Sequence, residues 1–239
     1  MTRRRWVADK VEGDRAYLLG EHALHLSRVL RAQPGQEFDI AVPAGVREGR
    51  IVSIQEDRVE FQLGPLLPVE ALPDVTLALA IFKFDRMEWA IEKSVELGVS
   101  RIIPFIAMRS EKHLAQAAGK RVERWRRLAL QASEQSRRSA PPEVADPVQL
   151  EALVKQSAST RIVLAETGAD VSLKDALRNG DPSLPKKLTL AIGPEGGWTT
   201  SELQTFAQSG WQSASLGPTV LRAETAALAA LAVAMSELQ

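Results

Sequence analysis

Two glycine turns near the end of the chain are the strongest candidates for a ligand site. Gly193-Pro194-Glu195-Gly196-Gly197 directly follows the apolar run Leu188–Ile192, and Leu216–Ala227 carries a second glycine turn before an alanine-rich helix. Each motif combines a strand end, a glycine turn and a helix start, which is where open α/β sheets bind their ligands. Two such turns so close in sequence predict one shared pocket.

The spacing of the glycines argues against two common classes of nucleotide-binding loop. Glycines at 193, 196 and 197 allow positive φ angles and let bare backbone approach a ligand closely. The loop is neither Gly-x-Gly-x-x-Gly nor a P-loop, so a nicotinamide oxidoreductase lacks its fingerprint here. Thr199 and Glu202 have the spacing of a capping box, which predicts a helix start directly after the loop.

A proline-rich segment divides the elements that must position these turns. Gly64–Asp74 holds three prolines in eleven residues, which cannot continue a helix or a central strand and therefore indicate a linker. We expect two domains, residues 1–68 and 74–239. Before the linker, short β-like runs surround one helix at 21–30, which predicts a small β-barrel. The runs are Arg4–Ala8, Arg15–Leu19, Gln36–Val42, Arg50–Gln55 and Arg58–Leu63.

After the linker, strand patterns alternate with helix patterns, which is typical of an α/β domain with a mainly parallel sheet covered on both faces. The expected strands are Val75–Ile81, Arg101–Ile106, Arg161–Ala165, Lys187–Ile192 and Gln212–Leu216. The expected helices are Arg86–Leu97, Val122–Arg137, Leu150–Gln156, Leu173–Leu177, Ser201–Gln208 and Glu224–Leu238.

Composition and charge limit the classes of function. The 239 residues include no cysteine, which excludes disulfides and thiol nucleophiles, and the His22/His25 pair lacks further ligands, so we expect no metal. We also expect a cytoplasmic protein without signal peptide or membrane span, because the longest apolar run is ten residues. Net charge is zero, but residues 101–140 carry 10 Lys and Arg against 3 Asp and Glu. That excess indicates a polyanion-binding patch, with a solvated helix face as the alternative.

Motifs along nearly the whole chain resemble those of the RsmE family of the SPOUT superfamily, bacterial methyltransferases that act on a uridine of 16S ribosomal RNA. The resemblance rests on Arg5-Trp6, His25–Arg31, Glu92–Val99, Arg124-Trp125, Glu134–Arg138 with Pro142-Glu143, Gly193–Gly197 and Leu216–Ala227. It implies a PUA-like RNA-binding barrel, followed by an α/β domain with a trefoil knot. It also implies a homodimer that packs through the C-terminal helix.

The resemblance implies S-adenosylmethionine as methyl donor, held where three strand ends meet and without a metal. A partly apolar pocket with backbone donors and acceptors suits this ligand. The expected cofactor-binding residues are Leu164, Glu166, Thr167, Ile192, Gly193, Pro194, Glu195, Gly196, Gly197, Leu216, Gly217, Leu221 and Thr225.

Arg222 and Glu224 are the expected catalytic residues for methylation of uracil at N3, which requires loss of the N3 proton. Arg222 suits stabilisation of the resulting anion, because a guanidinium stays charged and donates two parallel hydrogen bonds. It cannot be the base. Glu224 could orient Arg222 or take the proton, and the alternative is that Glu224-Thr225 is only the charged first turn of a helix.

Basic and polar side chains at helical spacing, near Arg28 and from Arg124 to Arg138, predict RNA contacts, in which phosphate contacts position the RNA and Gln135 could read a base edge. Arg5 could extend the basic path near Arg28, and the resemblance implies an RNA contact at Arg86, which occupies a family motif position. The expected RNA-binding residues are Arg5, Arg28, Arg31, Arg86, Arg124, Gln135 and Arg138. Two further functions stay open at this point. One is a non-catalytic RNA-binding or ribosome-assembly factor, and the other is a knotted methyltransferase that acts on tRNA.

Overall fold

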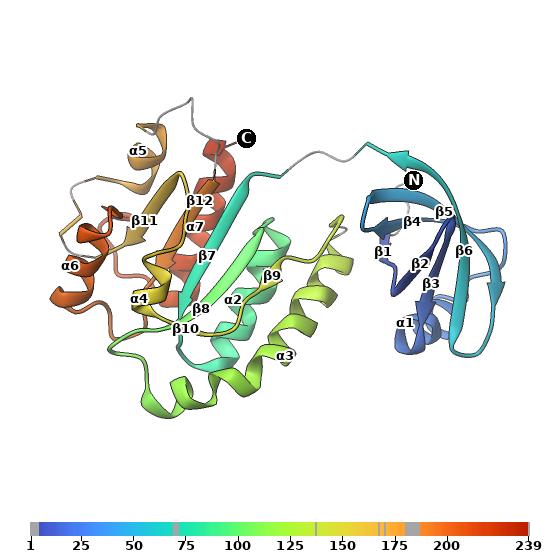
Figure 1. The fold of residues 1–239 in the computed structure, drawn as a ribbon, viewed down its shortest axis with the longest axis horizontal. Coiled ribbons are helices and arrows are strands. Elements are labelled where there is room, and N and C mark those ends of the chain that lie inside the picture. The colour runs from blue at the N-terminus through green and yellow to red at the C-terminus, as the bar shows by residue number, and fades with distance from the viewer. Residues whose placement is uncertain are drawn as a thin grey trace. The chain divides into compact units, whose positions relative to one another are not determined.

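The computed structural model describes residues 5–68, 72–136, 138–166, 168–169, 171–179 and 187–238. The chain forms two compact units, of which the first comprises Met1–Ala71 with Ser133–Pro141 and the second Leu72–Ala132 with Pro142–Gln239. Both units are visible in Figure 1. The predicted domain limits, 1–68 and 74–239, stay a prediction. Within the described part of the chain, no helix is long and apolar enough to cross a membrane.

The first unit is a six-stranded, curled sheet in the order β1-β4-β5-β6-β3-β2. Its strands are β1 (Arg5–Val7), β2 (Lys10–Glu12), β3 (Arg15–Leu19), β4 (Glu37–Val42), β5 (Gly45–Ile54) and β6 (Arg58–Leu67). All pairings are antiparallel except that of β1 with β4. Helix α1 (Gly20–Leu24) continues into a π-helical turn, His25–Val29, and Arg31 follows with φ +50°. The unit's own core contains Trp6, Leu18, Leu26, Ile40, Ile51 and Phe61.

Strand β6 is longer than the sequence predicts, because it includes Gly64 and Pro65 of the expected linker. The pairing of β5 with β6 shifts register between Arg47 and Gly49, so Pro65 falls at an irregularity, where its missing N–H costs no ladder hydrogen bond. Gly49 lies at the same irregularity. A Cβ at Gly49 would collide with Ile40 on β4, so glycine at this position lets β4 and β5 approach each other.

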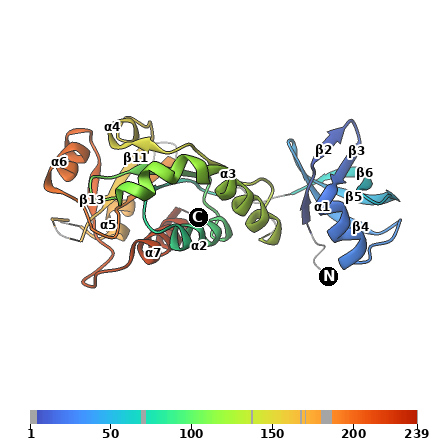
Figure 2. The ribbon, with the colours of Figure 1, turned by 90° about the horizontal axis from the view of Figure 1, so that it is seen from below.

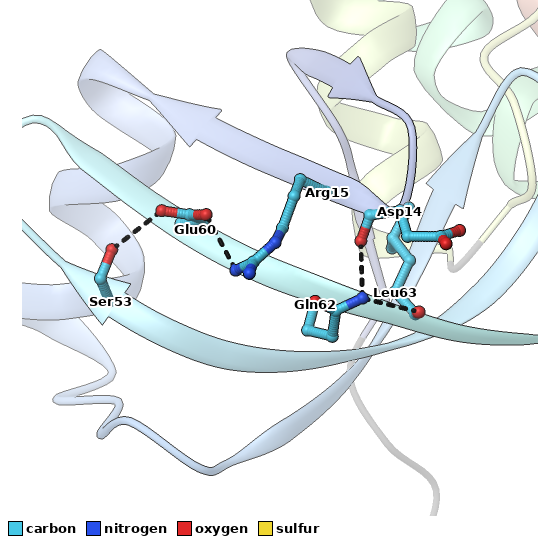
Figure 3. A network of polar contacts seen from close by, with 6 residues as sticks. All are labelled: Asp14, Arg15, Ser53, Glu60, Gln62 and Leu63. Atoms are coloured by element: carbon cyan, nitrogen blue, oxygen red, sulfur yellow. Dashed lines mark hydrogen bonds and ion pairs between the residues drawn. The ribbon is translucent and has the colours of Figure 1, made fainter.

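Polar side chains fix the register of the barrel strands on one face (Figure 3). Arg15 on β3 donates to Glu60 on β6 at 3.0 Å, and Ser53 on β5 donates to the other oxygen of Glu60 at 3.3 Å. Gln62 donates to the backbone oxygen of Asp14 at 3.1 Å. A one-residue slip of β6 would break all three hydrogen bonds.

The second unit contains a parallel sheet in the order β10-β8-β7-β12-β11-β13, with β9 beside β8. Its strands are β7 (Asp74–Ala80), β8 (Arg101–Ile106), β9 (Glu143–Val144), β10 (Val148–Gln149), β11 (Thr160–Leu164), β12 (Lys187–Ile192) and β13 (Gln212–Ala214). Its helices are α2 (Phe84–Glu96), α3 (Lys112–Gln135), α4 (Leu150–Leu153), α5 (Leu173–Arg178), α6 (Thr200–Gln208) and α7 (Ala223–Leu238). The expected α/β fold is confirmed. Helix α3 begins ten residues before its expected start.

Side chains of β7 alternate between two cores, one on each face of the sheet. Val75, Leu77 and Leu79 pack in the core that includes residues of α2 and α7, whereas Ala78 and Ala80 pack in a core with residues of α4 and α6. Figure 2 shows α2 and α7 together on one face of the sheet and α4 on the other. With both faces covered, ligands reach this sheet at the carboxyl ends of its strands.

Candidate active site at the carboxyl ends of three strands

A cavity of about 480 Å³ lies in the second unit, beyond the ends of β11, β12 and β13. This volume is in the usual range for a pocket that encloses a small molecule. The three expected walls meet there. The lining residues are Arg86, Arg109, Leu164, Ala165, Glu166, Ile192, Gly193, Pro194, Glu195, Gly196, Gly197, Trp198, Leu203, Leu216, Gly217, Thr219, Val220, Leu221, Arg222, Ala223 and Ala226.

Two of the expected cofactor-binding residues are not among the lining residues. Thr167 falls outside the described residues. Thr225 is exposed and does not line the cavity. Ala223 and Ala226 line the cavity from the same face of α7, because residues three apart share a helix face, and Thr225 points elsewhere.

The glycine loop is shaped by direct contacts with its neighbours. A Cβ on Gly193 would lie 3.0 Å from the ring of Trp198, and a Cβ on Gly196 would lie 3.2 Å from the Cβ of Arg109. Gly197 has φ +68°, which other residues rarely adopt. The expected capping box of Thr199 and Glu202 is confirmed, and it begins α6 directly after this loop.

Trp198 and Arg109 are site residues that the sequence analysis missed. The Trp198 indole N–H donates to the backbone oxygen of Leu164 at 2.6 Å, and the indole stacks on Phe105 with ring centroids 6.0 Å apart. Arg109 donates to the backbone oxygen of Gly196 at 2.8 Å. Together these contacts tie the loop after β12 to the ends of β11 and β8. The only available signal was the position of Trp198 next to Gly197.

The expected catalytic pair is not joined by an ion pair in the described part of the chain. Arg222 is exposed and lines the cavity. Glu224 is only 8% exposed, and its Oε1 atom lies 3.7 Å from Nε of Arg86, while its buried Oε2 atom has no hydrogen-bond partner among the described residues. Arg86 also donates through Nη1 to Oε1 of Glu195 at 2.5 Å. Arg86 therefore lies between Glu195, which lines the cavity, and Glu224, which is not among the lining residues.

The expected RNA-binding residues differ in how open they are to solvent. Arg28, Arg31, Arg124 and Gln135 are exposed, although Arg28 is paired with Glu56 at 2.9 Å and Arg124 with Glu88 at 2.7 Å.

Arg5 and Arg138, in contrast, are largely covered within the first unit. The Arg5 side chain is 17% exposed and lies 3.7 Å from Asp39. Burial lowers the pKa of the Arg138 guanidinium from its usual value. Glu134 lies 3.5 Å from His22, and burial raises the pKa of its carboxyl. Glu134 and Arg138 thus bring two partly covered charged groups to the first unit.

Comparison with known proteins identifies the family. A family model described as RNA methyltransferase domain matches residues 70–235. The ribosomal RNA small subunit methyltransferase E of Bacillus subtilis is 32% identical over 226 residues, covering 90% of this chain and 87% of that protein. The crystal structure of the enzyme of the same name from Neisseria gonorrhoeae, bound to S-adenosylmethionine, is 30% identical, with a TM-score of 0.83 over 98% of this chain and 97% of that one. A Legionella pneumophila structure with the same bound cofactor is 29% identical, with a TM-score of 0.83 over 99% and 98%.

The parallel sheet and its carboxyl-end cavity, together with the family model, define the second unit as an RNA methyltransferase domain. The likeness to its relatives extends through the first unit as well, over nearly the full length of both chains. The chain belongs to the ribosomal RNA small subunit methyltransferase E family. The family resemblance noted in the sequence is confirmed, and so is the expected architecture of an N-terminal β-barrel followed by a parallel-sheet α/β domain.

Proposed function

We propose that this chain transfers the methyl group of S-adenosylmethionine to N3 of a uridine in the 16S RNA of the small ribosomal subunit. The observation that carries the proposal is the cavity in which the glycine loop, Trp198 and the Leu216–Arg222 segment meet beside Arg86. Membership of the family supports the class of reaction. The experiment must test two finer assignments, namely N3 as the methylated atom and the small ribosomal subunit as the substrate.

The cavity residues fit the cofactor. Ile192, Leu216 and Leu221 offer apolar surface for an adenine ring, and the glycines leave backbone groups open to hydrogen bonds where a Cβ would fill the space. When bound, S-adenosylmethionine supplies a methyl group already activated on a sulfonium, so the chain needs no metal for this chemistry. We assign the cofactor-binding role to the lining residues between Leu164 and Leu221.

The chain's own residues must remove the N3 proton and stabilise the uracil anion. We assign anion stabilisation to Arg222, whose guanidinium can donate two parallel hydrogen bonds to a uracil oxygen as negative charge develops. We assign acceptance of the proton, as the N3–H bond breaks, to Glu224, whose buried side chain is outside the cavity lining and must turn toward the substrate to take it. Because Arg222 remains charged throughout, it cannot take this role itself.

Substrate binding would use both units. We assign phosphate contacts to the exposed arginines Arg28, Arg31 and Arg124, which would hold RNA without reading its sequence. We further propose the knot and the homodimer that the family resemblance implies, and a site of action on cytoplasmic ribosomal subunits. Leu228, Ala229 and Val233 on α7 are only partly buried within one chain, which leaves apolar surface for a second copy.

Methyl transfer from labelled S-adenosylmethionine to small-subunit particles and to free 16S RNA tests the proposal. We expect 3-methyluridine in the digested product. Arg222→Ala should abolish this product while cofactor affinity, measured by calorimetry, stays within about twofold of wild type. Arg178→Ala is a matched control, because Arg178 is an exposed arginine paired with Glu237 outside the cavity.

Three results would contradict parts of the proposal. Cofactor binding without transfer to either substrate would contradict the catalytic assignment. Absence of both would favour a ribosome-assembly factor. Loss of cofactor binding in a folded Arg222→Ala protein would place Arg222 in the cofactor site instead.

A further inference from the structure

Arg86 lies at the first turn of α2, just beyond the carboxyl end of β7, and its side chain is 30% exposed. Its position in a motif that resembles the family's implies an RNA contact. In the structure its guanidinium instead lies between two carboxylates from distant parts of the chain. Glu195 belongs to the glycine loop after β12, and Glu224 belongs to the first turn of α7.

The two contacts use different nitrogens of the same rigid group. Nη1 of Arg86 donates to Glu195 at 2.5 Å, and Nε lies 3.7 Å from Oε1 of Glu224. A guanidinium is planar and always charged, so it can hydrogen-bond one carboxylate and pair with a second at a fixed separation, which the flexible ammonium of lysine does not do. Arg86 therefore connects the loop that lines the cofactor cavity to the turn that carries Arg222.

We propose that Arg86 is a positioning residue that couples the cofactor loop to the Arg222–Glu224 turn. The inference rests on the proposed function, because it assigns the loop to cofactor binding and the turn to methyl transfer. Cofactor affinity and turnover therefore both depend on Arg86. Its guanidinium serves protein carboxylates rather than RNA phosphates.

Removal of Arg86 leaves Glu195, which lines the cavity, and Glu224, which does not, without the cation that they share. Glu224 is the more sensitive of the two, since it is 8% exposed and its second oxygen already lacks a hydrogen-bond partner in the described structure. A buried carboxylate that loses its positive partner is strongly disfavoured, so the turn moves toward solvent. The loop remains held from its other side, where Arg109 donates to Gly196. The expected result is a displaced turn, and a loop that is held from one side only, in a folded protein.

The experiment combines Arg86→Ala, Arg86→Lys, Glu195→Gln and the double variant Arg86→Ala with Glu195→Gln. Affinity for S-adenosylmethionine is measured by calorimetry on the full chain without RNA. We expect Arg86→Ala and Glu195→Gln each to weaken binding by about tenfold, the lower end for a charge-assisted hydrogen bond because the pair is partly exposed. The double variant should be no weaker than Arg86→Ala, since both changes remove one interaction.

Turnover separates positioning from a general loss of structure. At saturating cofactor, Arg86→Ala should lower kcat because the turn has moved, and Arg86→Lys should recover part of the affinity but little of kcat. Arg178→Ala is the control, since it removes an arginine–glutamate pair that also involves α7 but lies outside the cavity. Its affinity, kcat and melting temperature should match those of the wild type.

Wild-type cofactor affinity in Arg86→Ala, with only the KM for RNA raised, would overturn the proposal and make Arg86 an RNA ligand. Additive losses in the double variant would also overturn it. The proposed function fails in a different measurement, namely when the wild-type protein binds cofactor but forms no 3-methyluridine. The combined effect of the Arg86 and Glu195 substitutions on cofactor affinity is measured without RNA. A protein that forms no 3-methyluridine would therefore leave this measurement unaffected.

Discussion

Gly193→Ala tests how tightly the cofactor loop is built, because it adds a single methyl group to the cavity wall. The new Cβ would lie 3.0 Å from Cε2 and 3.1 Å from Nε1 of the Trp198 indole. The indole cannot easily move away. It donates to the backbone oxygen of Leu164 at 2.6 Å, stacks on Phe105 and makes an edge contact with Phe206.

The cost of this substitution can be estimated from those contacts. An extra methyl in a well-packed site typically costs about 1–3 kcal/mol. If the loop shifts to relieve the contact, most of this cost appears as weaker binding, which corresponds to about 5- to 150-fold in Kd for S-adenosylmethionine. If the indole shifts instead, the protein loses the Leu164 hydrogen bond, worth about 1 kcal/mol, and its melting temperature falls.

Calorimetric titration with S-adenosylmethionine and thermal melting together measure both routes. Gly197→Ala is the matched control, because no atom lies within 4 Å of its new Cβ and only its φ of +68° opposes the change. That control should cost about 1–2 kcal/mol from backbone strain alone. Wild-type affinity and melting temperature in Gly193→Ala would refute the steric reasoning.

Three further predictions concern other parts of the chain. Arg222→Lys keeps the positive charge but loses the bidentate fork of the guanidinium, so kcat should fall by at least about tenfold while cofactor affinity is unchanged. A kcat equal to that of the wild type would show that Arg222 does not stabilise the anion. Gly49→Ala should destabilise the barrel by about 1–3 kcal/mol through its collision with Ile40, measured by urea unfolding, while cofactor affinity in the other unit stays the same. Burial raises the pKa of Glu134 beside His22, so the folded state retains a proton that the unfolded chain releases above about pH 4.3. Wild-type stability therefore falls as pH rises from there through the folded pKa, and Glu134→Gln should flatten this decline in melting temperatures recorded from pH 4 to 8.

The sequence predicts the elements whose signals are local. Strand runs, the alternation with helices and the capping box at Thr199 all depend on residues within a few positions of one another, and the structure confirms them. The carboxyl-end position of the pocket also follows from sequence, since it needs only a parallel sheet with glycine turns after its strands.

The missed features depend on contacts between distant positions. Arg109 and Gly196 are 87 positions apart, and Trp198 reaches back 34 positions to Leu164, so no local pattern indicates either pair. The pairing of Arg86 with Glu195 could not be predicted for the same reason, because the two residues are 109 positions apart. The extension of β6 through Pro65 was missed because its tolerance depends on the register of the partner strand.

Helix α3 contributes residues to both units, so the two units are not independent segments of the chain. Its first 21 residues, through Ala132, belong to the methyltransferase unit, while Ser133–Gln135 belong to the barrel unit together with the segment through Pro141. The barrel is thus a discontinuous module, and excision of the first 71 residues would remove it without the segment that completes it. Fraying of the last turn of α3 then affects both units. We therefore expect hydrogen exchange at the end of α3 to report whether the two units unfold cooperatively. Recombination that exchanges N-terminal barrels between relatives would have to exchange a second, internal piece as well.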